Sequence, residues 1–161
     1  MTTPGRRRRA AAQPTAPAAV LLASTTGSFS PEAIRIATQA ADGRPVAVLV
    51  ITRIHGYALG IPNPGLLPTR REQETARNAV SDTVLALSRG GVSADGQVAA
   101  TRSAAKTIAR VARARGARHV VMDTPTGSRL RRFVEGEPSV GLRRRVDPSV
   151  SVHIVTRSQS E

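Results

Sequence analysis

The residues whose types and spacing suit chemistry lie in one segment, which runs from Asp123 to Glu137 after an apolar stretch. The segment begins with small residues, continues with basic and apolar ones, and reaches Gly136 just before a short helical pattern. Its basic residues are Arg129, Arg131 and Arg132. Turn amides and the amino terminus of a helix both favour anions, so this segment suits a phosphate cradle. A solvated basic loop explains the same residues equally well.

The known enzyme signatures are absent from the rest of the chain. There is neither a G-x-G-x-x-G nor a G-x-S-x-G motif, and Gly91–Gln97 has the glycine spacing of a P-loop without its lysine. The chain has no cysteine, which excludes thiol catalysis and cysteine-based zinc sites. The three histidines, His55, His119 and His153, lack metal-binding spacing. We therefore expect no catalytic residue and no metal.

The charge of the chain is strongly positive. Lysine and arginine number 24 against 11 acidic residues, which gives a formal net charge of +13, and Lys106 is the only lysine. Such a field attracts polyanions, and Arg6–Arg9 and Arg143–Arg145 are the densest clusters. The arginine and alanine bias of a GC-rich genome would produce the same charge without a function. Aromatic residues, which stack on bases, make up only 2% of the chain.

Apolar stretches alternate with helical patterns along the chain. Ser30 before Pro31 and the capping box Thr69–Glu72 mark helix starts, Ser103 is expected to cap a third helix, and Pro138–Val146 suits a fourth. Alternation of this kind predicts an α/β fold, with a parallel sheet covered by helices on both faces. The long Gly- and Pro-rich loop Thr52–Pro68 has no assigned role. The expected strands are Ala18–Ala23, Val46–Ile51, Gln97–Ala100, His119–Met122 and Val150–Thr156.

Five stretches, in this order and spacing, resemble the universal stress protein (UspA-like) family over Ala18–Val155. Two of them look like the family patterns GADLIVMG and SGLRRLLLG. The stretches are Val20–Ala23, Pro45–Ile51, Gly116–Met122, Ser128–Gly136 and Ser149–Val155. The resemblance implies a five-stranded parallel sheet of the adenine-nucleotide alpha-hydrolase-like type, for which we expect the order 3-2-1-4-5. It also implies frequent dimerisation and, in one branch of the family, ATP binding.

The ATP-binding pattern of that branch is degenerate in this chain. The branch carries G-x-x-G, nine residues, then G-[ST], together with an Asp after the first strand. The four motif positions align to Asp123, Thr126, Gly136 and Glu137, so only the third matches. The Asp position aligns to Thr25. The resemblance with these departures predicts weak ATP binding or none, and no other cofactor.

The main functional hypothesis is a non-catalytic, stress-associated regulatory protein. The alternatives are a basic module that binds nucleic acid or another polyanion, and a nucleotide-binding protein that uses a modified ATP site. We also expect a homodimer through the last strand, because its apolar residues alternate with polar ones on a predicted sheet edge. These apolar residues are Val150, Val152 and Ile154.

The expected organisation is one domain over residues 18–156. Residues 1–17 are predicted to form a disordered basic tail, and residues 157–161 a C-terminal tail. The longest strongly apolar run, Val46–Ile51, is far shorter than a membrane span. Pro14 and Pro17 interrupt the only segment that resembles a targeting signal, so we expect a cytoplasmic protein without membrane partners.

Overall fold

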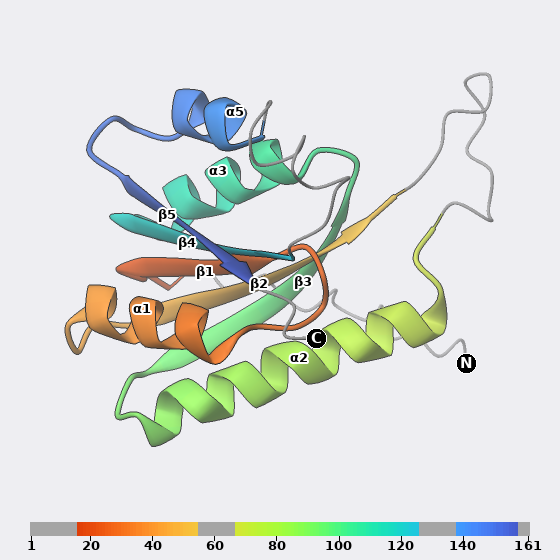
Figure 1. Ribbon diagram of the computed structural model, residues 1–161, viewed down its shortest axis with the longest axis horizontal. Helices are drawn as coiled ribbons and strands as arrows, with labels where there is room; N and C mark the ends of the chain where they lie inside the picture. Colours follow the sequence, from red (N-terminus) through yellow and green to blue (C-terminus); the bar gives the residue numbers. More distant parts are fainter. Residues whose placement is uncertain (1–15, 55–66, 126–137, 158–161) are drawn as a thin grey trace, which may run out of the picture.

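A computed structural model describes residues 16–54, 67–125 and 138–157, and Figure 1 shows its arrangement. The described residues form one five-stranded sheet in the order β3-β2-β1-β4-β5, and every neighbouring pair is parallel. The predicted fold class and strand order are therefore confirmed. In chain order the elements are β1 (Val20–Ser24), α1 (Pro31–Ala41), β2 (Val46–Arg53), α2 (Arg70–Arg89), β3 (Ala94–Thr101), α3 (Ala104–Arg115), β4 (His119–Pro125), α5 (Pro138–Arg145) and β5 (Ser151–Arg157).

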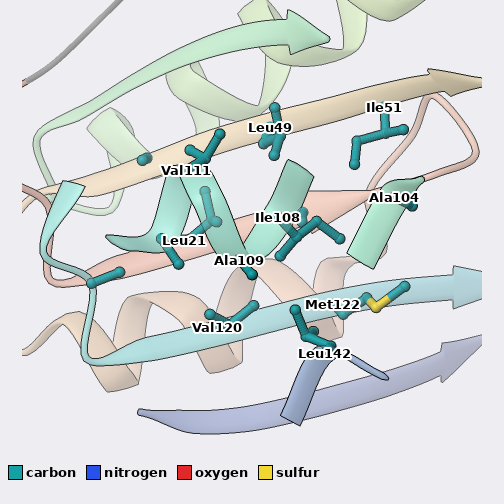
Figure 2. Packing of buried hydrophobic residues seen from close by; sticks show 14 of the residues in the cluster. Leu21, Leu49, Ile51, Ala104, Ile108, Ala109, Val111, Val120, Met122 and Leu142 are labelled. Carbon is teal, nitrogen blue, oxygen red and sulfur yellow. The ribbon is translucent and has the colours of Figure 1, made fainter. Parts of the chain in front are cut away.

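The helices cover the two faces of the sheet in pairs. Figure 1 shows α3 and α5 on one face and α1 and α2 on the other. Each face encloses its own apolar cluster, as expected for a sheet buried on both sides. On the α3 side, Leu21, Leu49 and Val120 of the strands pack against Ile108 and Leu142 of the helices (Figure 2). The β1 strand has no exposed residue, because it lies in the middle of the sheet.

Two of the three predicted helix caps are present in detail, whereas the side chain of Ser103 makes no capping hydrogen bond at the start of α3. The Ser30 side chain accepts a hydrogen bond from the Ala33 amide, and Pro31 occupies the first turn of α1. Thr69 and Glu72 form the predicted capping box at the start of α2. Each cap satisfies amide donors that have no partner within the helix, so both helix ends are fixed locally by sequence.

All five strands end later than the sequence indicated, and β1 ends at Ser24, one residue after the expected Ala23. The third strand is expected within Val92–Ala100, over its later half Gln97–Ala100, whereas β3 begins at Ala94 and ends at Thr101. The fourth was expected to end at Met122, but β4 reaches Pro125. The second strand and the fifth also end later than predicted, at Arg53 and Arg157. In each case polar or small residues continue the backbone pairing after the apolar pattern has ended, because the ladder bonds involve the main chain only.

A buried ion pair joins α3 to the amino end of the sheet. Arg115, whose side chain is 2% exposed, donates to both carboxylate oxygens of Asp95 on β3, over 2.8 and 2.6 Å. Its Nε also donates to the carbonyl oxygen of Ala16. Ala16, which lies two residues ahead of the expected domain start at residue 18, is therefore in contact with α3.

Candidate functional site

In open parallel sheets, ligands bind beyond the carboxyl ends of the strands, where the strand order changes direction. Here that point lies between β1 and β4, whose last paired residues are Ser24 and Asp123. The loop after β1 leads from this edge to Ser30, the N-cap of α1. This edge is the candidate site, because it brings a carboxylate, hydroxyls and a helix amino terminus together.

Asp123 is the central residue of the candidate site, and it is fully buried. Its Oδ2 accepts a hydrogen bond of 2.5 Å from the Ser30 amide and one of 2.8 Å from Nη2 of Arg157. Its Oδ1 accepts a bond of 3.2 Å from Nε of Arg157. The guanidinium therefore donates to both carboxylate oxygens, which is the strong, bidentate geometry of an arginine–carboxylate pair. The remaining nitrogen, Nη1, donates to the Ser28 hydroxyl over 2.8 Å.

The loop between β1 and α1 is folded around the Ser24 side chain. The Ser24 hydroxyl donates to the Ser28 carbonyl oxygen over 2.7 Å, and it accepts a bond of 3.2 Å from the Thr26 amide. Thr25, at the position where the resembled family has an Asp, is half-buried in this loop. The loop holds Ser28 and Ser30 where Arg157 and Asp123 reach them, so this loop and the ends of β4 and β5 meet in one network.

The amino terminus of α1 has few donors left for a bound anion. The Ser30 amide bonds to Asp123, Pro31 has no amide hydrogen, and the Ala33 amide bonds to the Ser30 side chain. A helix amino terminus usually attracts anions through these donors and its dipole. Here a carboxylate of the same chain already occupies that position.

A cavity of about 470 Å³ lies beside the Asp123–Arg157 pair, where α1 begins and β5 ends. Glu32 and Arg157 are the charged residues of its wall, so both signs of charge face the space. Its lining residues are Phe29, Ser30, Pro31, Glu32, Val155, Thr156 and Arg157.

The structure describes some of the predicted site residues and not others. It brings Asp123 to the carboxyl edge of the sheet as expected, and Thr25 lies in the adjoining loop. Val150 and Val152 pack partly against the α3-side core, and Ile154 is half-buried on the same strand as Val152. Six predicted positions lie outside the described residues: Thr126, Arg129, Arg131, Arg132, Gly136 and Glu137.

Sequence reasoning missed Arg157, Ser28 and Ser30 as members of this network. The sequence pattern places residue 157 in the C-terminal tail and indicates Ser30 only as a helix cap. The missed signal is the alternation in β5, because Arg157 falls on the same face as Val155, the register partner of Asp123. An arginine two residues beyond the partner of a buried aspartate, on the same face, is within reach of its carboxylate.

The two described histidines lie at the opposite, amino end of the strands. Their ring centroids are 5.8 Å apart, and the ring planes are tilted by 31°. Burial of the ring is the main reason that the pKa of His119 lies below its usual value, and the positive charges of His153, Arg44 and Arg118 lower this pKa further. Within the described ranges no three potential metal-ligating side chains gather in one place. The same ranges contain no helix that is long and apolar enough to cross a bilayer.

Comparison with solved structures places this chain in a known fold class. A universal stress protein family structure from Burkholderia pseudomallei superimposes with a TM-score of 0.59 at 18% identity, covering 85% of this chain and 95% of that one. A universal stress protein in complex with cAMP gives 0.53 at 18%, covering 89% and 100%. The Archaeoglobus fulgidus protein in complex with dAMP gives 0.53 at 14%, covering 86% and 96%.

The chain therefore has the fold of the universal stress proteins. No protein-family model and no curated protein matches the sequence, so the similarity is one of fold. The described residues account for all five strands of that fold and for the edge at which its candidate site lies.

Proposed function

We propose that this chain is a regulatory protein of the universal stress type that catalyses no reaction and binds ATP weakly or not at all. The observation that carries the proposal is the Asp123 carboxylate, which occupies the amino terminus of α1 and the guanidinium of Arg157. These are the groups that a phosphate would use at this edge. A ligand phosphate would have to displace a buried, bidentate ion pair, which is costly.

The site chemistry also supports a role without catalysis. A nucleophilic hydroxyl needs an adjacent base that accepts its proton. The Ser24 hydroxyl donates to a main-chain carbonyl, and the Ser28 hydroxyl accepts from a guanidinium, which has no proton-accepting capacity. The carboxylate of Asp123 is engaged by Arg157 and Ser30. This is the arrangement of a structural network.

Calorimetry with Mg-ATP tests the proposal on the unmodified protein. We expect no binding at ATP concentrations below about 1 mM. A dissociation constant of about 1 mM corresponds to a binding free energy of roughly −4 kcal/mol. The physical reason is that the donors at the carboxyl edge are already bonded within the chain. A dissociation constant in the micromolar range would contradict the proposal.

A pair of variants then tests whether Asp123 itself closes the site. Asp123→Gly combined with Glu137→Ser frees Arg157 and the Ser30 amide, and we expect ATP to bind at least tenfold more tightly than to the unmodified protein. The matched control combines Asp42→Gly with Glu137→Ser. Asp42 has a φ of 49°, which glycine adopts readily, and the control has the same change in charge. Equal gains in both variants would show that Asp123 does not close the site, because the two variants share the change in charge and the Glu137→Ser substitution.

The free edge of β5 supports a homodimer as part of the same proposal. Among the residues that the structure describes, β5 is the outer strand beside β4, and Val152 and Ile154 are only half-buried. The Ser151 amide donates to the Arg118 carbonyl on the inner side. The main-chain groups of Val152 and Ile154 therefore point to the open side, because successive residues of a strand alternate. An open edge of this kind pairs with another strand.

Light scattering on the purified chain tests the dimer. We expect twice the monomer mass of 16.9 kDa at micromolar concentration. Ile154→Glu places a charge on the open edge and shifts the mass to that of the monomer. The control is Leu85→Glu, at a 54% exposed position on α2, which leaves the dimer intact. A monomeric unmodified protein would exclude this assembly.

A further inference from the structure

The charge of the molecule is unevenly divided between its two helical layers. The α3 and α5 helices contain seven basic residues and no acidic one. The α1 and α2 helices contain five basic residues and four acidic ones. Both layers are helical and amphipathic, so the difference does not arise from the kind of element. The α3 and α5 helices are therefore strongly positive, and the α1 and α2 helices are close to neutral. Asp147, two residues after α5, is an acidic neighbour that interacts with Arg113.

Six of the seven cations on α3 and α5 are exposed, and we call them the basic face. Positions 106, 110 and 113 fall within an arc of roughly 60° on α3 and extend about 10 Å along its axis. The α5 helix lies beside α3 in Figure 1, and Nη2 of Arg113 donates to the Arg145 carbonyl oxygen over 3.2 Å. The two sets of cations therefore form one surface. The basic face consists of Lys106, Arg110, Arg113, Arg143, Arg144 and Arg145.

The ion pairs found in the described part of the chain involve other cations. They are Arg35–Glu32, Arg70–Glu74, Arg115–Asp95 and Arg157–Asp123. Neighbouring like charges on a helix are unfavourable by a few tenths of a kcal/mol per pair. A general arginine bias would enrich every helix equally and would not remove acidic residues from one layer. Segregation of charge therefore needs a reason besides composition.

We propose that the basic face binds the phosphate backbone of double-stranded nucleic acid without reading its sequence. Five of its six cations are arginine, whose planar guanidinium forms paired hydrogen bonds with phosphate oxygens. Aromatic residues are 2% of the chain, so stacking on the bases of single strands has little support. A duplex offers closely spaced phosphates along its axis, which match a row of cations on a helix.

The apolar surface argues for nucleic acid over an anionic membrane. Peripheral helices that bind membranes insert large apolar side chains between the lipids. Among the described residues the exposed large apolar ones are Leu67 and Leu85. Leu85 lies on α2, and Leu67 lies three residues before the start of α2. Neither belongs to α3 or α5. The basic face therefore presents charge without apolar anchors.

Fluorescence anisotropy with a labelled duplex of about 20 base pairs tests the proposal on the full chain. Each neutralised phosphate contributes about −0.9 to the slope of log K against log salt, so six contacts give a slope of about −5. We expect this slope, and equal affinity for two unrelated sequences. A flat salt response, or strong preference for one sequence, would overturn the proposal. So would binding to vesicles with 30% phosphatidylserine in the absence of binding to the duplex.

Two triple variants separate the basic face from net charge. The face variant carries Lys106→Gln, Arg110→Gln and Arg144→Gln, all exposed. We expect its dissociation constant to rise at least tenfold and its salt slope to fall by two to three units, because about three phosphate contacts are lost. The control variant loses the same charge from the opposite layer, and we expect less than a twofold change. It carries Arg71→Gln, Arg77→Gln and Arg89→Gln, which are exposed on α2.

The outcomes of this comparison are distinct. Greater weakening in the face variant supports the proposal. Equal weakening in both variants assigns binding to the overall charge and overturns it. Replacing Arg6–Arg9 with glutamine tests the third source of charge. If that change abolishes binding while the face variant binds normally, the tail binds the duplex and the proposal is wrong. Circular dichroism of every variant confirms that the fold is retained.

Discussion

Replacing Arg157 with methionine is expected to lower the free energy of unfolding by about 3–5 kcal/mol. The change removes the guanidinium that faces both oxygens of Asp123 and leaves a fully buried carboxylate without its cation. Removing one partner of a buried pair is far more costly than the pair is favourable, because the remaining charge stays desolvated. Urea unfolding followed by circular dichroism measures the effect.

The exposed pair Arg35–Glu32 provides the matched control for this experiment. Its side chains are 59% and 61% exposed and 3.9 Å apart, so Arg35→Met is expected to cost less than about 1 kcal/mol. Arg157→Lys keeps the charge and loses the paired geometry, so an intermediate loss is expected. Equal effects of Arg157→Met and Arg35→Met would show that the Asp123 network does not stabilise the fold.

Replacing Asp95 with alanine is expected to cost about 3 kcal/mol or more. Arg115 is 2% exposed, so its guanidinium would remain buried after both of its carboxylate contacts are lost. Asp95 itself is 40% exposed, and the cost therefore arises from the arginine. The control is Glu74→Ala in the exposed pair with Arg70, for which we expect less than about 0.5 kcal/mol.

The double variant Asp95→Ala with Arg115→Met distinguishes the reason for that loss. Methionine fills the buried position without a charge, so most of the stability is expected to return. A double-mutant cycle from urea unfolding gives the coupling energy between the two positions. If the loss of stability in the double variant equals the sum of the losses in the two single variants, the ion pair is not the source of the effect.

The order and direction of the strands could be predicted because their signals are strong and local. Buried strands such as Val46–Ile51 form continuous apolar runs, and helix caps such as Thr69–Glu72 are visible in sequence. The ends of strands were predicted less well. Asp123 and Thr124 are buried polar residues within β4, and no apolar pattern marks such positions. Main-chain pairing, which every residue type can make, determines where the strand ends.

The network at the candidate site depends on contacts that sequence spacing does not reveal. Asp123 is identified as a site position because it aligns to the first glycine of the ATP-binding pattern. The partner Arg157 lies 34 residues away along the chain. Only the parallel pairing of β4 with β5 brings the two together. The hydrogen bond from Ser30, 93 residues away, depends in the same way on the three-dimensional fold.

The basic face consists of cations that are far apart in the sequence and come together only in the fold. Lys106, Arg110 and Arg113 follow helical spacing, but they are separated by about 30 residues from the cluster Arg143–Arg145. The cluster is visible in the sequence because it is continuous, whereas the cations of α3 are spread out. Their common surface follows from the packing of α5 beside α3.

The central position of β1 has a consequence for the order in which the chain emerges from the ribosome. Residues 20–101 contain the strands of one half of the sheet, β3-β2-β1, and can assemble while the rest is being made. The second edge of β1 then stays open until β4 has been synthesised, because Val20 pairs with His119. At about 5–20 residues per second, an apolar strand edge is exposed for roughly one to a few seconds. In nascent chains of this protein, β1 is therefore a temporary edge strand, although it lies in the middle of the finished sheet. Chaperones or neighbouring chains can pair with this edge until β4 covers it.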